Sequence, residues 1–164
     1  MEVHARRMVL LVLLAPCVGG CAPNTLQRRL ADRGVVYDRC PKIVIVGSEA
    51  DYGPISVTLT ASPMSQEVWD TIIPARPFKI WYASGYRQVR FYTHEDSTEP
   101  AAILLVNASG VAHIEGDGDG PDWTQEGWYY CPGLGPFVMK LLEAEHQRRQ
   151  RLRAVGPDGG VPSP

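Results

Sequence analysis

Short apolar or alternating segments of the length of β-strands, separated by turn residues, recur along this chain. Residues 42–46 form a β-branched apolar run, and residues 55–60 alternate strictly between apolar and hydroxyl side chains. Residues 101–106 are continuously apolar, which is typical of a central strand covered on both faces, and residues 111–115 follow a loop signal as its partner. These segments predict a fold built mainly of short antiparallel strands.

The clearest turn signal predicts a hairpin over residues 78–93 that turns at Ser84-Gly85. A two-residue loop sets a register in which Phe78 lies opposite Phe91 on the core side. The other side then presents three basic and aromatic residues: Lys79, Trp81 and Arg90. Two interpretations remain open for this side, namely a face that binds an anionic or sugar ligand and a face that another segment covers.

The helical pattern is strongest over residues 137–155, where an apolar stripe covers the first half and the second half is nearly all polar. Residues 25–34 fit about two helical turns, but we interpret them mainly as part of a solvated linker. Residues 66–73 fit a short helix or a strand. The predicted architecture is therefore a small antiparallel β-sandwich or an α+β sheet, with one C-terminal helix.

The beginning of the chain departs from this pattern and has the three parts of a secretory signal. Arg6 and Arg7 give a charged start, residues 8–15 are apolar, and small residues follow at Gly19-Gly20. The apolar run is less than half of the roughly 20 residues that span a bilayer. Pro16 and the glycine pair also interrupt a buried helix after two turns. A cleaved signal is therefore favoured over a transmembrane helix.

The end of this segment, Val18-Gly19-Gly20-Cys21, resembles the lipobox of bacterial lipoprotein precursors. The resemblance implies that a signal peptide of residues 1–20 is removed and that Cys21 carries diacylglyceryl and further acyl (palmitate-type) chains. An ordinary cleaved signal is the alternative, and Cys17 is the less suitable lipidation site because Pro16 precedes it. One acyl chain binds membranes only marginally, so several chains on one residue give a permanent anchor.

The implied localisation is the cell envelope. Ala22 stands where enteric lipoproteins of the inner membrane carry aspartate, so the resemblance implies the periplasmic face of the outer membrane. After the signal we expect a lipidated tether over residues 21–38, one domain over residues 39–155 and a disordered tail over residues 156–164. The formal net charge of −2 gives no support to nucleic-acid binding.

Cys40 and Cys131 remain once Cys17 leaves with the signal and Cys21 is lipidated. In the oxidising periplasm they allow one intramolecular pairing, and we expect a structural disulfide between them. The alternative is a reactive or metal-binding pair. Neither a C-x-x-C spacing nor a nearby histidine cluster supports that alternative.

Candidate chemistry is sparse. No nucleophile, phosphate, dinucleotide or zinc-protease motif occurs, so we expect no enzyme and no cofactor. The acidic segment 115–122 begins like a calcium loop at Asp117 and Asp119, but Trp128 stands where the bidentate glutamate belongs. A glycine-rich turn is favoured there, and calcium binding stays open.

Two functional interpretations follow. The first is a membrane-anchored accessory or interaction module of the cell envelope that contacts an envelope protein partner. The second is a ligand-binding or inhibitory lipoprotein, because the Ser109-Gly110 loop, Trp123 and Gly127 resemble features of periplasmic lysozyme inhibitors. That family inserts a Ser-Gly loop into the lysozyme cleft, so the resemblance implies a similar role for Ser109-Gly110.

Overall fold

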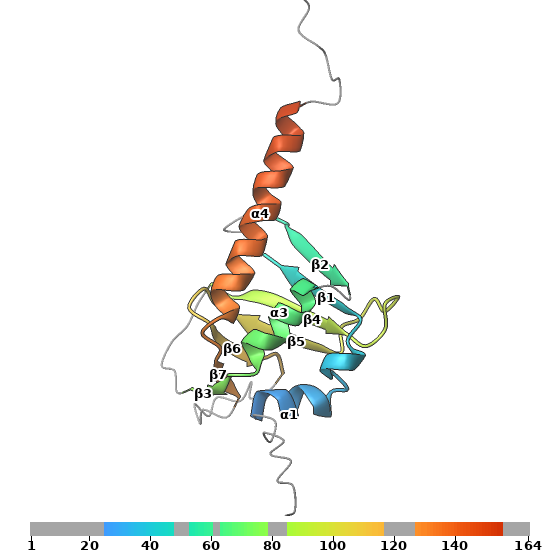
Figure 1. Cartoon of the computed structure of the whole chain (residues 1–164), viewed down its shortest axis with the longest axis vertical. Helices are drawn as coiled ribbons and strands as arrows, with labels where there is room; N and C mark the ends of the chain where they lie inside the picture. Colours follow the sequence, from blue (N-terminus) through green and yellow to red (C-terminus); the bar gives the residue numbers. More distant parts are fainter. Residues whose placement is uncertain (1–24, 48–52, 61–62, 79–84, 117–126, 156–164) are drawn as a thin grey trace, which may run out of the picture.

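The computed structural model describes residues 25–47, 53–60, 63–78, 85–116 and 127–155 (Figure 1). These residues form one antiparallel sheet of seven strands in the order β2-β1-β4-β5-β6-β7-β3. The strands are β1 (Lys42–Val46), β2 (Ser56–Thr60), β3 (Arg76–Pro77), β4 (Arg87–Tyr92), β5 (Ala102–Val106), β6 (Val111–Ile114) and β7 (Trp128–Tyr130). The helices are α1 (Thr25–Asp32), α3 (Pro63–Ile72), α4 (Leu134–Val155) and the 3-10 helix η1 (Tyr37–Arg39). An α+β sheet with a C-terminal helix is confirmed. The two-sheet sandwich is wrong for the part of the chain described.

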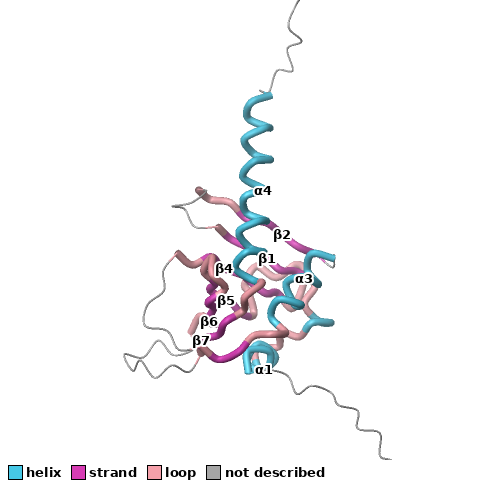
Figure 2. Tube along the Cα trace, turned by 60° about the vertical axis from the view of Figure 1, so that its left-hand side comes forward, coloured by secondary structure: helices cyan, strands magenta, loops and turns pink. Residues whose placement is uncertain are grey.

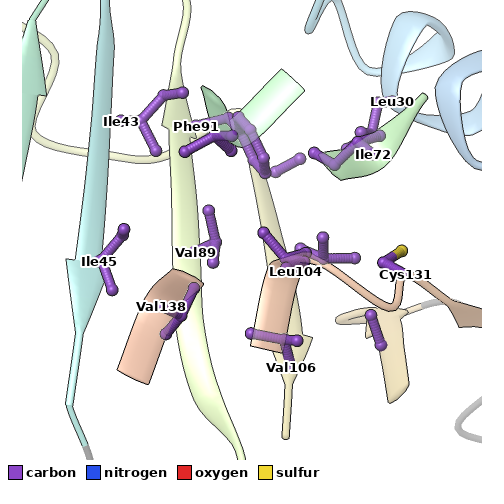
Figure 3. Packing of buried hydrophobic residues seen from close by; sticks show 14 of the residues in the cluster. Leu30, Ile43, Ile45, Ile72, Val89, Phe91, Leu104, Val106, Cys131 and Val138 are labelled. Carbon is purple, nitrogen blue, oxygen red and sulfur yellow. The ribbon is translucent and has the colours of Figure 1, made fainter. Parts of the chain in front are cut away.

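The helices pack on one face of the sheet, and buried apolar side chains fill the space between the two layers (Figures 2 and 3). The register aligns these side chains in rows, because Ile45 of β1 lies opposite Val89 of β4, which lies opposite Leu104 of β5. All three are fully buried. Ile72 of α3 and Val138 of α4 complete the core from the helical layer. The alternation along each strand thus separates an inward face from an outward face.

The central strand of the sheet is β5, as its continuous apolar run predicts. Its exposure nevertheless alternates. Ala102, Leu104 and Val106 are buried, whereas Ile103 and Leu105 on the other face are half-buried. The expectation that both faces of this strand are covered is therefore correct for the inward face alone.

The predicted hairpin over residues 78–93 is wrong. Strand β4 pairs with β1 and β5, and Phe91 lies opposite Ile43 and Ala102 rather than Phe78. Phe78 lies beside β7, where its N–H donates to the carbonyl oxygen of Trp128 (3.0 Å). The local turn signal was outweighed by the burial available to β4 in the middle of the sheet, where both of its edges are paired.

Helix α1 is part of the domain. Leu26 and Leu30 lie one turn apart on the same side of the helix, and both are fully buried in the core. The expected tether over residues 21–38 is therefore wrong from Thr25 onward. The burial of two leucines in the core outweighs the polar composition of the remaining α1 positions.

Helix α4 begins at Leu134, three residues earlier than its sequence pattern predicts, with Pro136 in the first turn where proline is tolerated. Its first half packs on β1, β2 and α3, and its second half continues past the edge of the sheet (Figure 1). Arg149 ties this second half to the domain, because its Nη1 donates to the carbonyl oxygen of Pro54 (3.1 Å). Among the described residues, no helix is long and apolar enough to cross a membrane.

The expected disulfide is also wrong, because Cys40 and Cys131 are both free, buried thiols. Cys40 precedes β1, and Cys131 follows β7. These strands lie four positions apart in the sheet, about 19 Å at a spacing of ~4.8 Å, and they run in the same direction. The two cysteines therefore sit at opposite ends of distant strands, whereas a disulfide requires Cα atoms within about 7 Å of each other.

Candidate binding face

The sheet face that points away from α1, α3 and α4 is the strongest candidate for a functional surface, and we refer to it as the open face (Figure 2). Strand register places one row of residues across it: Val46, Gln88, Leu105, His113 and Trp128, in that order. All five side chains are half-buried. No described helix covers this row, and its side chains are partly exposed.

Three rings on the open face form a mutual cluster, which we name the ring cluster: Tyr86, His113 and Trp128. His113 and Trp128 are directly opposite each other on β6 and β7, and their ring centroids are 4.5 Å apart. Tyr86 lies 6.0 Å from each of them, edge-on to the imidazole. Such tilted and edge-on arrangements are favourable, so the cluster is a preformed aromatic platform.

The platform continues to the edge of the sheet. Phe78 and Tyr130 have ring centroids 5.6 Å apart, and the guanidinium of Arg76 lies 5.3 Å from the centre of the Tyr130 ring. Phe78 is 37% exposed, a large fraction for a phenylalanine. The edge therefore offers an accessible ring beside a cation that stacks on a second ring.

The electrostatics of the open face are one-sided. None of the seven strands contains an aspartate or a glutamate. Arg90 lies on this face of β4, and its Nε and Nη2 both donate to Oε1 of Gln88 (2.8 and 2.6 Å). Lys42, at the end of β1, donates to the carbonyl oxygens of Glu95 and Ser97. The face is therefore suited to an uncharged or anionic ligand.

Of the three residues predicted to form a binding face, the structure places Arg90 on the open face, and Lys79 and Trp81 lie outside the described residues. Trp128 and Tyr130 also lie on the open face, because alternate residues of a strand point to the same side. The sequence does not connect them with Arg90 or His113, since that requires the order of the strands. The alternating pattern of residues 111–114 is the signal that places His113 on the outward side.

The Ser109-Gly110 segment forms a tight turn between β5 and β6. Oδ1 of Asn107 accepts hydrogen bonds from the Ser109 N–H (3.1 Å), the Ser109 hydroxyl (2.8 Å) and the Val111 N–H (2.9 Å). Gly110 is buried, and its carbonyl accepts from the N–H of Cys131 (2.8 Å). Gly110 therefore belongs to a turn that packs against the residues at the start of α4.

The two buried thiols have raised pKa values. Burial raises the pKa of Cys131 to about 12, and burial also raises the pKa of Cys40, whose Sγ lies 3.6 Å from the carbonyl oxygen of Lys42. A thiol must ionise to act as a nucleophile or bind a metal, so neither cysteine is poised for chemistry. Within the described ranges, no three histidine, cysteine or acidic side chains are grouped to hold a metal ion, and Asp117 and Asp119 lie outside them.

Comparison of the chain with protein-family models, with curated proteins and with solved structures finds no match.

Proposed function

We propose that this chain is a lipid-anchored protein of the bacterial cell envelope that serves as a binding module. The anchor is supported by the apolar run, the two small residues and the cysteine of the segment that ends at Cys21. Cys21 is four residues before α1, so the chain passes almost directly from the anchor into the folded domain. The periplasmic face of the outer membrane is the proposed location.

The binding role rests on one observation: the open face combines an aromatic platform with arginines and is built from strands that contain no acidic residue. Aromatic rings pack on the apolar faces of sugar rings, and guanidinium groups pair with carboxylates. The ligand class that matches both features is a carboxylate-bearing glycan of the cell envelope. An envelope protein partner bound by the same face is the alternative.

Sedimentation with purified peptidoglycan sacculi tests this ligand class. We expect the full-length protein in detergent to pellet with sacculi, and we expect Trp128→Ala and Arg90→Ala each to weaken the association several-fold. Thr58→Ala is the matched control, because Thr58 is an exposed residue on the same face of β2, away from the rings. Circular dichroism checks that the variants are folded.

Two results would overturn the glycan assignment. One is a wild-type protein that stays in the supernatant, and the other is equal pelleting of the wild type and the Trp128 variant. A photo-crosslink from a residue of the open face to an envelope protein, lost in Arg90→Ala, would establish the protein partner instead.

The anchor has its own test. Cells that express the full chain are grown with an alkyne fatty acid, and we expect label on the wild type and on Cys17→Ala but none on Cys21→Ala. Mass spectrometry of the mature protein should show an acylated N-terminus at Cys21. An unlabelled protein that retains residues 1–20 would refute the lipoprotein assignment.

A further inference from the structure

The end of the domain that carries α1 and η1 has a surface suited to lipid headgroups. Leu26 and Leu30 face the core, and Arg28 lies two residues from each, about 200° around the helix from both. Its side chain is exposed on the outermost side of α1. Helix α1 lies at the end of the domain opposite the free end of α4, in both views (Figures 1 and 2).

Two exposed side chains with apolar surface lie in the segment that follows α1 along the chain. Val36 is 39% exposed, and Tyr37, which begins η1, is 50% exposed although its ring meets the edge of Trp69 at 6.0 Å. Arg39 follows in the same 3-10 helix and is exposed. Tyrosine is enriched where membrane meets water because its ring is apolar and its hydroxyl is polar.

The length of chain before α1 restricts where this end can lie. Three residues lie between Cys21 and Thr25, and a fully extended chain from one Cα atom to the other reaches at most about 14 Å. Because its two leucines are buried, α1 cannot move away from the domain without exposing the core. A lipid attached to Cys21 therefore holds the whole α1 end of the domain close to the bilayer surface.

We propose that the α1–η1 end, defined by Arg28, Val36, Tyr37 and Arg39, docks on the anionic lipid surface of the membrane that holds the protein. This inference rests on the proposed lipid anchor. Arginines are attracted to an anionic leaflet, and exposed Asp32 on α1 offsets part of that attraction. Docking orients the protein, with the arginine-rich end of α4 directed away from the membrane.

Quenching of a site-specific fluorophore in proteoliposomes tests the docked orientation. The full-length lipidated protein carries the fluorophore at position 37 (Tyr37→Cys) or position 152 (Leu152→Cys), and the vesicles contain phosphatidylglycerol and a headgroup-level quencher. The native Cys40 and Cys131 are buried, so labelling at neutral pH is directed to the introduced thiol. We expect at least threefold stronger quenching at position 37 than at position 152.

Charge reversal supplies the matched comparison. Arg28→Glu with Arg39→Glu should reduce the quenching at position 37 by at least half in phosphatidylglycerol vesicles and leave it unchanged in phosphatidylcholine vesicles. Arg151→Glu with Arg153→Glu makes the same charge change on α4 and should have no effect.

Vesicle flotation separates the two ways in which the proposal can fail. A protein that floats with the vesicles but shows equal quenching at positions 37 and 152 is anchored without docking, which overturns the present inference alone. A protein that does not float has no lipid anchor, which overturns the proposed function and the docking together.

Discussion

Alanine substitutions at three glycines test the contact between the β5–β6 turn and the start of α4. Gly110 has a φ of +88°, and an added Cβ would lie 2.9 Å from the carbonyl carbon of Cys131 and closer still to its oxygen. Gly135, in the first turn of α4, would place a Cβ 2.5 Å from the Asn107 carbonyl oxygen and from the Gly110 nitrogen. Gly53 has a similar φ of +69° but open space around it.

Alanine at these three positions separates the cost of backbone strain from the cost of a steric clash. Gly53→Ala should lower the free energy of unfolding by about 1–2 kcal/mol, because alanine is strained in a left-handed backbone conformation. Gly135→Ala gains about 1 kcal/mol of helix propensity but must push two backbone segments apart, and overpacking costs about 1–3 kcal/mol, occasionally more. Gly110→Ala carries both penalties, so we expect it to lose about 2–5 kcal/mol of the free energy of unfolding.

Urea unfolding of the three variants, followed by tryptophan fluorescence, measures these differences. For a domain of this size, 1 kcal/mol corresponds to a shift in Tm of about 4 °C, so Gly110→Ala should melt roughly 8–20 °C below the wild type. Ser109→Ala in the same turn removes one hydroxyl hydrogen bond and should cost only about 1 kcal/mol. If Gly110→Ala proves no less stable than Gly53→Ala, the close approach of the turn to α4 is refuted.

Four further predictions test other parts of the structure. In urea unfolding, Leu30→Ala should lower the free energy of unfolding by about 2–5 kcal/mol and Arg28→Ala by less than about 0.5 kcal/mol. Equally small effects of the two substitutions would show that α1 is a solvated linker. A thiol reagent at pH 8 should leave Cys40 and Cys131 unmodified in the native state and modify both in denaturant, and a native mass two hydrogens lower would reveal a disulfide. Because burial raises the pKa of Cys131 to about 12, the stability present below pH ~9 should decline as pH rises from about 9 to 12, and a Cys131→Ser variant should show a smaller decline. Hydrogen bonds from two arginines lower the pKa of Glu145 to about 2, so the difference in Tm between the wild type and Glu145→Gln should persist down to pH ~4.5 and vanish as pH falls through about 2. A difference that disappears already at pH 4 would contradict these ion pairs.

The two free thiols change the interpretation of an envelope location. In the proposed envelope location unpaired cysteines need protection, and both side chains are buried. Burial keeps them protonated, which disfavours oxidation and exchange. The domain therefore relies on its hydrophobic core rather than on a covalent bridge for stability.

Much of the secondary structure could be predicted from local pattern alone. The strict alternation of residues 55–60 and the β-branched run of residues 42–46 identify strands and their inward faces, because side chains on a strand point alternately to opposite sides. Phe91 was likewise assigned to the core side, and it is fully buried. These features depend on neighbours a few residues away.

The partners of those strands could not be predicted in the same way. A turn signal at Ser84-Gly85 favoured a local hairpin, but β4 pairs instead with β1, which lies some 45 residues earlier in the chain. Pairing of this kind depends on which distant segment buries the most apolar surface against β4. The local pattern of a single sequence does not show which segment that is. Cys40 and Cys131 were expected to pair because they are the two cysteines that remain after the signal segment, and the order of the strands keeps them apart.

By itself, the sequence determined the strands and the alternation of their faces, since both depend on residues that are close together along the chain. The tertiary structure alone decided that α1 belongs to the core, that the two buried thiols stay apart, and that Arg90 shares an open face with His113 and Trp128. The first depends on the packing of α1 against the core, and the other two depend on the order of strands in the sheet, which decides which distant parts of the chain are neighbours.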